Sequence, residues 1–381
     1  MSGKPLENVL IISLEQAVAA PVCTARLANA GARVIKVERP EGDFARDYDD
    51  LVKGEASYFV WANHGKESIC LNLRLDGDRE IFESILSVAD VLVQNLSSGA
   101  IDRLGYSWET LHARYPRLIV CSISGYGEGN PYARMRAYDM LIQAESGLSS
   151  ISGNGRIGIS IADIVTGINA YGAILEALAQ RERTGEGSYL SASLFGSMAD
   201  LMAVPLLQTY YGDQPPTYMG MRHPSIVPYG AFPTADDTEV VVAIQNEREW
   251  QRLCCDVLEA PELLSREGFD SNTARTAARA LVESTLSAIT RRLPEKDFIQ
   301  RLDDNQIAYG KLNEARDVLE HPALRWAHVA LSNGEKVQLP APPVQAAWIS
   351  EDLAQCPALN QDGQAIAEEF AAPQSRSPQH G

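Results

Sequence analysis

The chain has 381 residues, 45% of them hydrophobic, so it can bury a substantial core in two domains or in one large domain with an insertion. Its formal net charge of −17 argues against nucleic acid as the main partner, because binding to phosphates needs a basic face. Its six cysteines show no CxxC spacing, no secretory signal precedes them, and no apolar run approaches the ~20 residues of a membrane span, so we expect a cytoplasmic protein that binds no membrane.

The first elements form a strand-helix-strand unit. Residues 9–14 are a short apolar run, a helical pattern opens at Pro21 and ends at Gly31, and residues 33–38 are typical of a second strand. A dinucleotide-binding fold begins in this way, but no GxGxxG motif follows the first strand, so a nicotinamide cofactor has no support. The six histidines lack HExxH or a similar ligand spacing, so we expect no metal site.

The alternation of helix and strand resumes beyond a polar region at residues 42–54. Helical patterns at residues 78–88 and 108–114 lead into apolar strands at residues 90–95 and 117–122. Such regular alternation predicts an α/β fold with a mostly parallel, doubly wound sheet that carries helices on both faces.

Polar residues and glycines follow several of these strands. Arg39 comes after the second strand, Asn95 ends the strand at residues 90–95, and Gly125 and Gly127 follow the next one. Open α/β sheets bind their ligands at the carboxyl ends of the strands. We therefore expect the ligand of this protein at the same edge.

Asp163 lies where a polar segment turns into a helix. Ile168, Tyr171 and Leu175 recur after it at helical spacing, which predicts an amphipathic helix with one buried stripe. We expect Asp163 at or beside the helix N-cap, where free N–H groups and the helix dipole favour an ionised carboxylate. Such a carboxylate can act as a nucleophile at neutral pH or serve only as a cap, and the residues alone leave both roles open.

Two glycines, Gly167 and Gly172, lie within this predicted helix. A glycine in a helix interior costs about 1 kcal/mol relative to alanine. Their presence predicts that another segment approaches the start of the helix closely. The helix is expected to end at Gly185, before a strand at residues 188–192.

The composition changes in the second half of the chain. Residues 210–228 are rich in Pro, Gly, Tyr and Met, which predicts a linker between a large α/β domain over residues 1–209 and a smaller α/β domain over residues 229–330. A C-terminal segment over residues 331–371 follows, and the tail at residues 372–381 is expected to be disordered.

A series of short motifs makes the chain resemble the family III CoA-transferases, the CaiB-BaiF-like group that contains formyl-CoA transferase. The resemblance covers roughly residues 5–345; each motif alone is weak, but their order and spacing are specific. The motifs lie at residues 31–38, 42–43, 63–68, 90–95, 102–105, 125–127, 138–139, 162–163 and 223–224.

The resemblance implies that Asp163 is the catalytic nucleophile, with helix capping as a compatible second role. It implies a ping-pong transfer in which this aspartate forms mixed anhydrides and an aspartyl-CoA thioester. It also implies that residues 331–371 return to the large domain, that the smaller domain is inserted between these two parts, and that two chains interlock as a homodimer.

CoA carries a pyrophosphate and a 3′-phosphate, so its site needs local cations despite the acidic total charge. The resemblance implies that CoA thioesters are substrates and that no cofactor is tightly bound. The residues that it places in contact with CoA or beside it are Arg39, Arg74, Asn95, Leu96, Arg103 and Arg136, with Lys66 as a less certain candidate.

Tyr138 separates two chemistries within the superfamily. The related α-methylacyl-CoA racemases carry a histidine at the matching position and use it with the catalytic carboxylate as an acid/base pair. A phenol, with a pKa of about 10, moves protons poorly in both directions, so Tyr138 favours transfer over racemisation.

The acceptor pocket is expected to contain Gln16, Val18, Tyr48 and Tyr138. Val18 stands where formyl-CoA transferase has a glutamine, and the stretch over residues 14–21 looks more like the members that use small dicarboxylates. Three further residues are candidates for binding the distal carboxylate of such an acid. They are Arg46, Arg222 and His223.

We therefore expect an acyl-CoA:carboxylate CoA-transferase that moves CoA from a short acyl-CoA, with succinyl-CoA as the first candidate, to a small dicarboxylic acid. Its partners would be these substrates and a second copy of the chain. The alternatives are an α-methylacyl-CoA racemase and a non-catalytic acyl-CoA-binding protein.

Overall fold

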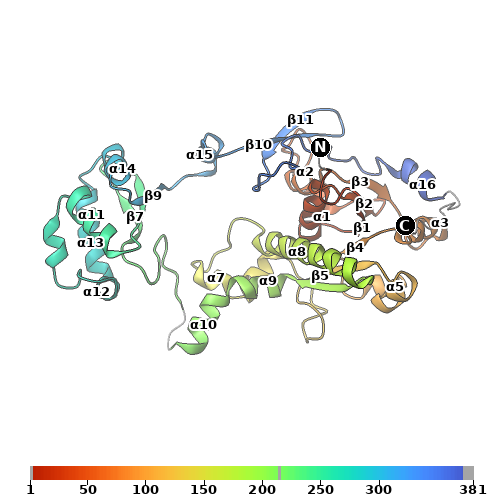
Figure 1. The fold of residues 1–381 in the computed structure, drawn as a ribbon, viewed down its shortest axis with the longest axis horizontal. Coiled ribbons are helices and arrows are strands. Elements are labelled where there is room, and N and C mark those ends of the chain that lie inside the picture. The colour runs from red at the N-terminus through yellow and green to blue at the C-terminus, as the bar shows by residue number, and fades with distance from the viewer. Residues whose placement is uncertain (1–2, 213–215, 372–381) are drawn as a thin grey trace. The chain divides into compact units, whose positions relative to one another are not determined.

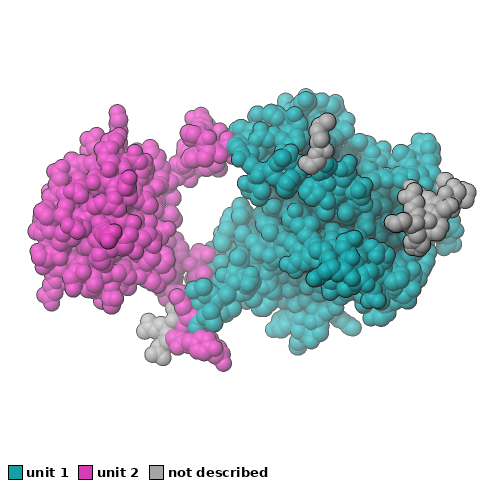
Figure 2. All heavy atoms as spheres, in the orientation of Figure 1, with its two compact units in different colours: residues 1–149, 155–207, 325–381 teal, residues 150–154, 208–324 magenta. Residues whose placement is uncertain are grey.

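The computed structural model describes residues 3–212 and 216–371 (Figure 1). The chain divides into two compact units: unit 1 comprises Met1–Ser149, Gly155–Leu207 and Arg325–Gly381, and unit 2 comprises Ser150–Asn154 and Gln208–Leu324 (Figure 2). The tail expected to be disordered, residues 372–381, and part of the expected linker, residues 213–215, lie outside the described residues.

The first part of the chain alternates strands and helices as its sequence pattern predicts. The elements are β1 (Leu10–Leu14), α1 (Ala19–Asn29), β2 (Arg33–Glu38), η1 (Phe44–Asp47), α2 (Ser57–Asn63), β3 (Glu67–Cys70), α3 (Asp76–Leu86), β4 (Val91–Gln94), α4 (Ala100–Arg103), α5 (Trp108–Arg114), β5 (Ile119–Ser124), α6 (Asp139–Glu145), α7 (Leu148–Ile151), α8 (Ile161–Thr184), β6 (Tyr189–Ser193), α9 (Leu194–Leu201) and α10 (Ala203–Tyr211).

Six of these strands form one parallel sheet in the order β3-β2-β1-β4-β5-β6. The chain winds outward from β1 in one direction to β3, then returns to β4 and winds the other way. The carboxyl ends of β1 and β4 thus adjoin where the winding reverses, which is where such sheets form a ligand crevice. The predicted α/β class with a doubly wound parallel sheet is confirmed.

Helices cover both faces of this sheet. On one face α3, α5 and the C-terminal helix α16 (Gly363–Ala371) share a core with the strands, through Phe82, Leu111 and Ile366. On the other face α1 contacts β2 and β4, and α8 contacts β5 and β6. The N-terminal ends of α1 and α8 lie at the crevice.

Helix α8 packs directly on α1, and Gly167 allows the close approach. A Cβ atom added at Gly167 would lie 2.5 Å from the carbonyl oxygen of Ala19 and 3.0 Å from Cβ of Val22. At Gly172 the added atom would have no neighbour within 4 Å. The predicted close approach is therefore found at Gly167 and not at Gly172. By length and composition α8 would also suit a membrane span; in this structure it packs on α1 and against β5 and β6.

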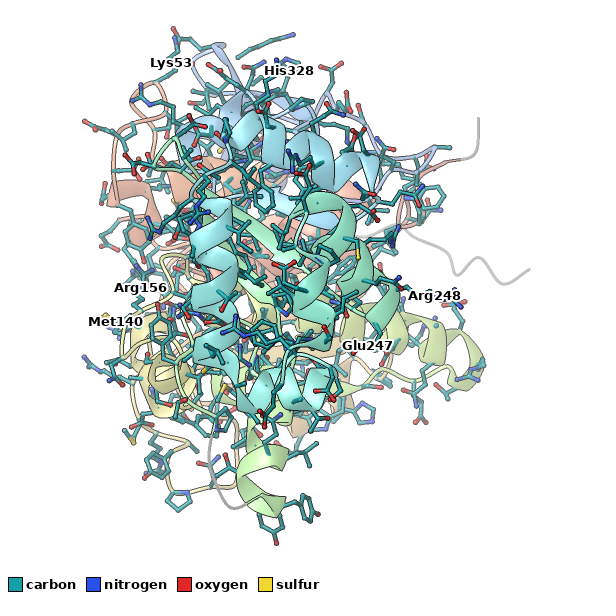
Figure 3. All side chains as sticks on the ribbon, turned by 90° about the vertical axis from the view of Figure 1, so that its left-hand side faces the viewer. Lys53, Met140, Arg156, Glu247, Arg248 and His328 are labelled. Carbon is teal, nitrogen blue, oxygen red and sulfur yellow. The ribbon has the colours of Figure 1, made fainter. Side chains whose placement is uncertain are left out.

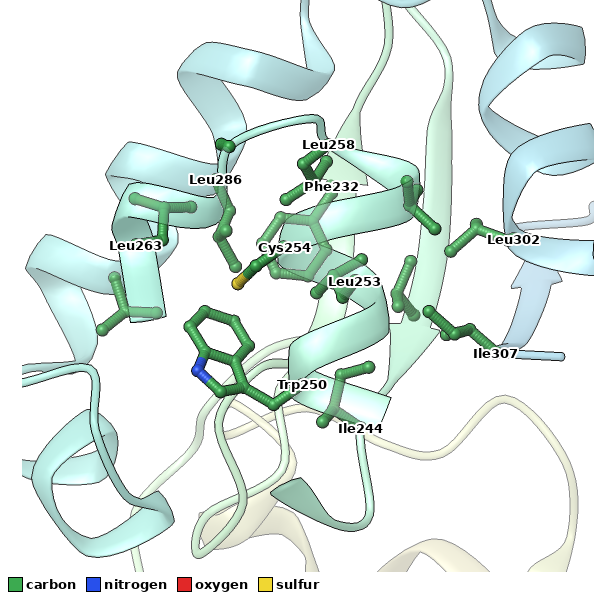
Figure 4. Packing of buried hydrophobic residues seen from close by; sticks show 14 of the residues in the cluster. Phe232, Ile244, Trp250, Leu253, Cys254, Leu258, Leu263, Leu286, Leu302 and Ile307 are labelled. Atoms are coloured by element: carbon green, nitrogen blue, oxygen red, sulfur yellow. The ribbon is translucent and has the colours of Figure 1, made fainter. Parts of the chain in front are cut away.

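Unit 2 has a separate core built on a three-stranded antiparallel sheet in the order β7-β8-β9. Trp250, Phe232 and Cys254 pack in this core with aliphatic side chains (Figure 4). The elements are β7 (Tyr229–Pro233), β8 (Glu239–Ala243), α11 (Glu247–Arg252), η2 (Leu253–Val257), η3 (Pro261–Ser265), α12 (Asn272–Ala277), α13 (Arg279–Thr290), α14 (Glu295–Asp304), β9 (Ala308–Lys311) and α15 (Ala315–Leu319).

The chain rejoins unit 1 at Arg325. Strand β10 (Trp326–Ala330) pairs antiparallel with β11 (Lys336–Pro340), so β10 belongs to unit 1, whereas the sequence-based boundary placed it in the smaller domain. The last helix, α16, contacts α3 and β3. The boundary differs because pairing with β11, which the local sequence of β10 does not reveal, decides where β10 packs.

Substitution of the two glycines of α8 should have opposite effects on stability. Gly167→Ala should lower the free energy of unfolding by roughly 1–3 kcal/mol, because its methyl group would overlap the backbone of α1. Gly172→Ala, the matched control, should raise it by up to about 1 kcal/mol through helix propensity alone. Urea unfolding of both variants measures the difference, and equal effects would contradict the packing described here.

Candidate active site

The loop after β1 is held in an unusual backbone conformation at the crevice. The N–H of Gln16 donates to Oδ1 of Asn95 at 2.9 Å, and Nδ2 of Asn95 donates back to the carbonyl oxygen of Gln16 at 2.8 Å. Ala17 follows with φ of 63°, in the left-handed region, and its N–H donates to Oδ1 of Asp43 at 3.0 Å. Side chains from two distant segments therefore fix the backbone of this loop.

Asp43 belongs to a buried network of charges beneath the loop. Its Oδ2 accepts from Nζ of Lys36 at 2.7 Å, and Nζ of Lys66 donates to Oε1 of Glu15 at 2.6 Å. The side chains of all four residues are fully shielded from solvent. Oδ1 of Asn63 accepts from both lysines, at 3.0 Å each. The network thus links the ends of β1 and β2 to α2 and β3.

Neighbouring carboxylates favour the charged form of the two buried lysines. Burial alone would lower the pKa of Lys36, but the charges of Glu15 and Asp43 reverse the effect and raise it. Burial lowers the pKa of Lys66 to about 8, against the attraction of Glu15. Lys66 is therefore a partner of Glu15 inside the protein and not the CoA contact that the sequence suggested.

Arg46 is also committed to the interior. It pairs with Glu38 at 2.7 Å and its guanidinium lies 3.7 Å from the centroid of the Phe59 ring. Arg46 does not line the cavity that contains Asp163, so the structure gives no support to the acceptor role predicted for it. Arg222 and His223 lie in unit 2, where Arg222 pairs with Glu283 at 2.7 Å, and their predicted role stays a prediction.

A cavity of about 670 Å³ opens beside Asp163 in unit 1. Polar and aromatic groups at the carboxyl edge of the sheet line it, and eight residues predicted for the site are among them. They are Gln16, Val18, Tyr48, Asn95, Leu96, Arg136, Tyr138 and Asp163. Of these, Val18 is the most buried and packs with Val22 and Ala62.

A second cavity of about 930 Å³ contains the other three predicted arginines, Arg39, Arg74 and Arg103. The two cavities share Gln16, Leu96 and Ser97 in their walls, so they adjoin at the end of β4. Three of the arginines predicted to contact CoA thus lie in one cavity and Asp163 in the other, which suits a long anionic ligand whose reactive group lies far from its phosphates.

Asp163 is the third residue of α8, and the helix N-cap is Ser160. Asp163 therefore lies three residues after the N-cap, within the first turn of the helix, and not directly beside the cap as predicted. Burial, and then the negative charge of Asp139, raise the pKa of Asp163 to about 7. The expectation that the helix start favours the ionised form of this carboxylate is not reflected in its pKa, which burial raises.

Asp139 is the neighbour that the sequence analysis did not place in the site. Its Oδ1 accepts from the N–H of Ala162 at 2.9 Å, so it caps the start of α8 from another helix. Its Oδ2 accepts from Nε2 of Gln143 at 2.8 Å and lies 3.6 Å from Nε of Arg156. Two carboxylates and one guanidinium therefore meet at this end of the cavity.

Aromatic rings form one wall near Asp163. Tyr48 and Tyr58 meet edge to face with ring centroids 5.9 Å apart, and the hydroxyls of Tyr58 and Ser160 are 3.0 Å apart. Burial, followed by the charges of Asp43 and Asp163, raises the pKa of Tyr48 to about 12, so it remains a hydrogen-bond donor. Tyr58 gave no signal in the sequence, because it lies on an ordinary amphipathic helix.

The arrangement suits acyl chemistry on a carboxylate. Asp163 presents a carboxylate that is largely removed from bulk water, and a carboxylate in such a place can act as an oxygen nucleophile. Among residues 3–212 and 216–371 no group of three or more His, Cys, Asp or Glu side chains is placed to hold a metal ion.

Comparisons with known proteins agree with this geometry. A family model described as CoA-transferase family III matches residues 6–363. The chain is 34% identical to the acetyl-CoA:oxalate CoA-transferase of Acetobacter aceti, over 98% of this chain and 97% of that protein. It is 32% identical to the succinyl-CoA:glutarate CoA-transferase of Mus musculus, over 94% and 84% respectively. A solved structure of a CAIB/BAIF family protein from Brucella suis is 31% identical, with a TM-score of 0.83 over 97% of this chain and 100% of that one.

The raised pKa of Asp163 predicts a pH-dependent effect of its substitution. An unfolded aspartate has a pKa of about 3.9, so between about pH 4 and pH 7 the folded state binds the proton more readily and stability falls as pH rises. Asparagine does not titrate. Asp163→Asn should therefore raise the free energy of unfolding at pH 8 by roughly 1–2 kcal/mol, allowing for partial exposure of the carboxylate, and change it little at pH 4.

Urea unfolding at the two pH values measures this difference. Asp76→Asn, which removes an exposed carboxylate from the first turn of α3, is the matched control and should give no such gain at pH 8. An equal effect of Asp163→Asn at both pH values would show that the carboxylate has an ordinary pKa.

Proposed function

Because the chain belongs to CoA-transferase family III, we propose that it moves CoA from a short acyl-CoA, with succinyl-CoA as the first candidate, to a small dicarboxylic acid. The observation that carries the proposal is the half-buried carboxylate of Asp163, in a cavity that adjoins a second cavity with three arginines. The named relatives support the acceptor class, since they act on oxalate and glutarate.

In the proposed reaction the ionised Asp163 attacks the thioester carbonyl of the donor, which gives a mixed anhydride and CoA thiolate. The thiolate attacks the aspartyl carbonyl of the anhydride, which releases the donor acid and leaves CoA on Asp163 as a thioester. The acceptor carboxylate attacks this thioester, which expels CoA thiolate and forms a new anhydride, and the thiolate then attacks the acyl carbonyl of that anhydride. Acceptor-CoA leaves, and the carboxylate of Asp163 is restored.

The proposed CoA contacts divide between the two cavities. Arg39, Arg74 and Arg103 are exposed and line the same cavity, so they suit the pyrophosphate and 3′-phosphate. Asn95 and Leu96 lie at the end of β4, beside that cavity. CoA thioesters act in this scheme as substrates that come and go, and no tightly bound cofactor is required because the anhydrides and the thioester store the acyl energy.

Tyr138 supports transfer over racemisation. Its side chain is exposed into the cavity that contains Asp163, where a racemase would need a group that both accepts and donates a proton. A phenol is a very weak base and is ill suited to that task. The same ring can instead contact the acyl group of the substrate.

We further propose that the protein is a homodimer, interlocked as the family resemblance implies, and that it acts in the cytoplasm. Helix α10 has no buried side chain, and Val204, Leu206 and Leu207 lie exposed on it. Large exposed apolar patches mark interaction sites, and a second copy of the chain is the partner proposed here. The six cysteines are all free, which agrees with a reducing compartment.

Trapping of the covalent intermediate tests the proposed reaction. After mixing with succinyl-CoA, intact-mass analysis should show CoA attached to Asp163, and hydroxylamine should convert that residue to a hydroxamate. Asp163→Ala should lose the adduct and lower transfer by about 10³-fold or more while CoA binding persists. If several short acyl-CoAs bind without forming an adduct, the transferase mechanism fails, and deuterium exchange at the acyl α-carbon would then support a racemase.

Light scattering after size exclusion tests the dimer. The protein should elute with twice the mass of one chain. Val204→Asp should weaken the association, because it buries a charge at the proposed interface. Leu51→Asp introduces the same charge at another exposed apolar position and should leave the dimer intact. A monomer at micromolar concentration would contradict the proposal.

A further inference from the structure

The cavity beside Asp163 is lined by a cationic side chain, Arg156, that has no role in the proposed reaction. Arg156 lines this cavity, and 41% of its side chain is exposed. Its single ionic contact among the described residues is a loose one, 3.6 Å from Nε to Oδ2 of Asp139. A guanidinium has five N–H donors, so most of those of Arg156 remain available to a ligand.

Hydrogen bonds from Gln143 fix the backbone of the segment that carries Arg156. Gln143, which is fully buried, accepts from the N–H of Ile157 through Oε1 at 2.9 Å and donates to the carbonyl oxygen of Ile159 through Nε2 at 3.2 Å. The same Nε2 donates to Asp139 at 2.8 Å. One amide thus ties the segment that carries Arg156 to the carboxylate beside Asp163.

Other cations of unit 1 are less suited to the acyl end of the substrate. Lys36, Lys66 and Arg46 each form an ion pair with a buried carboxylate. Arg39 and Arg103 belong to the adjoining cavity. Arg134 and Arg136 line the cavity of Asp163, but among the described residues neither pairs with the carboxylates at its end, as Arg156 pairs with Asp139. Figure 3 labels Arg156 and Met140, which both line this cavity.

Charge balance explains why an arginine is needed there. Once Asp163 carries CoA as a thioester it is neutral, but Asp139 keeps its negative charge at the same end of the cavity. A dicarboxylic acid brings a second carboxylate that does not react. That group would be repelled by Asp139 unless a cation lay between them.

Resting on the proposed function, we propose that Arg156 binds the distal, non-reacting carboxylate of the dicarboxylic acid and so selects diacids over monoacids. The guanidinium bridges Asp139 on one side and the substrate carboxylate on the other, in the bidentate manner that suits its planar fork. Arg156 thereby takes the role for which the sequence analysis offered Arg46, Arg222 and His223. It determines specificity and takes no part in bond making.

The test compares glutarate with valerate, which has the same chain length and one carboxylate, at saturating succinyl-CoA. In a ping-pong reaction the kcat/KM of the acceptor reports the second half-reaction alone. Arg156→Gln should lower the ratio of kcat/KM for glutarate over valerate by about tenfold or more, mainly through KM for glutarate. Arg156→Lys keeps the charge without the fork and should restore part of the ratio.

Arg134→Gln is the matched control, because it removes the same charge from the same cavity, and it should leave the ratio within about threefold of the unmodified protein. An unchanged ratio in Arg156→Gln, or an equal loss for both acids, overturns the role of Arg156. Trapping of the CoA adduct distinguishes failure of this inference from failure of the proposed function. If the adduct forms and the ratio is unchanged, only this inference fails; if the unmodified protein forms no adduct, the proposed function fails with it.

Discussion

The charge pairs of Lys36 with Asp43 and of Lys66 with Glu15 hold together the part of the fold that carries the site. All four side chains are removed from water, so each charge depends on its partner, and loss of one partner typically costs about 3–5 kcal/mol. Such pairs add little net stability compared with apolar packing, but they specify geometry. Here Asp43 uses its second oxygen to hold the N–H of Ala17, which keeps that residue at φ of 63° at the edge of the cavity.

Asp163 is also removed from water, but unlike the buried lysines it has no partner of opposite charge in the described chain. Burial together with Asp139 raises its pKa to about 7. A carboxylate that is only partly ionised near neutral pH costs stability, yet it is poorly solvated and therefore a better nucleophile than an exposed one. The buried lysines thus have carboxylate partners, whereas the carboxylate of Asp163 has no cationic partner among the described residues. Active sites commonly show this contrast, because reactivity and stability place opposite demands on the same group.

Much of the fold follows from local patterns. The apolar runs that became β1, β2, β4 and β5 and the helical periods of α3 and α5 are visible in the sequence because each element is buried along one face or throughout. The helix α2 and the strand β3 were missed for reasons of composition. Strand β3 begins with the polar residues Glu67 and Ser68 and shows no apolar run, and the aromatic and β-branched residues of α2 do not indicate a helix. Asp163, with Arg39, Arg74 and Arg103, was found from motif order, and the structure brings these residues to two adjoining cavities.

The sequence by itself determined the α/β class and the family, and it singled out Asp163 as a candidate, because these depend on periodicity and on motifs that are local in the chain. The tertiary structure alone decided which charges are free. Arg46 and Lys66 read as ligand-binding cations but are paired inside the protein, whereas Arg156 gave no signal and lies open in the cavity. The physical reason is that a buried charge is compensated by whichever partner the fold brings near, and Lys66 finds Glu15 across 51 positions of the chain.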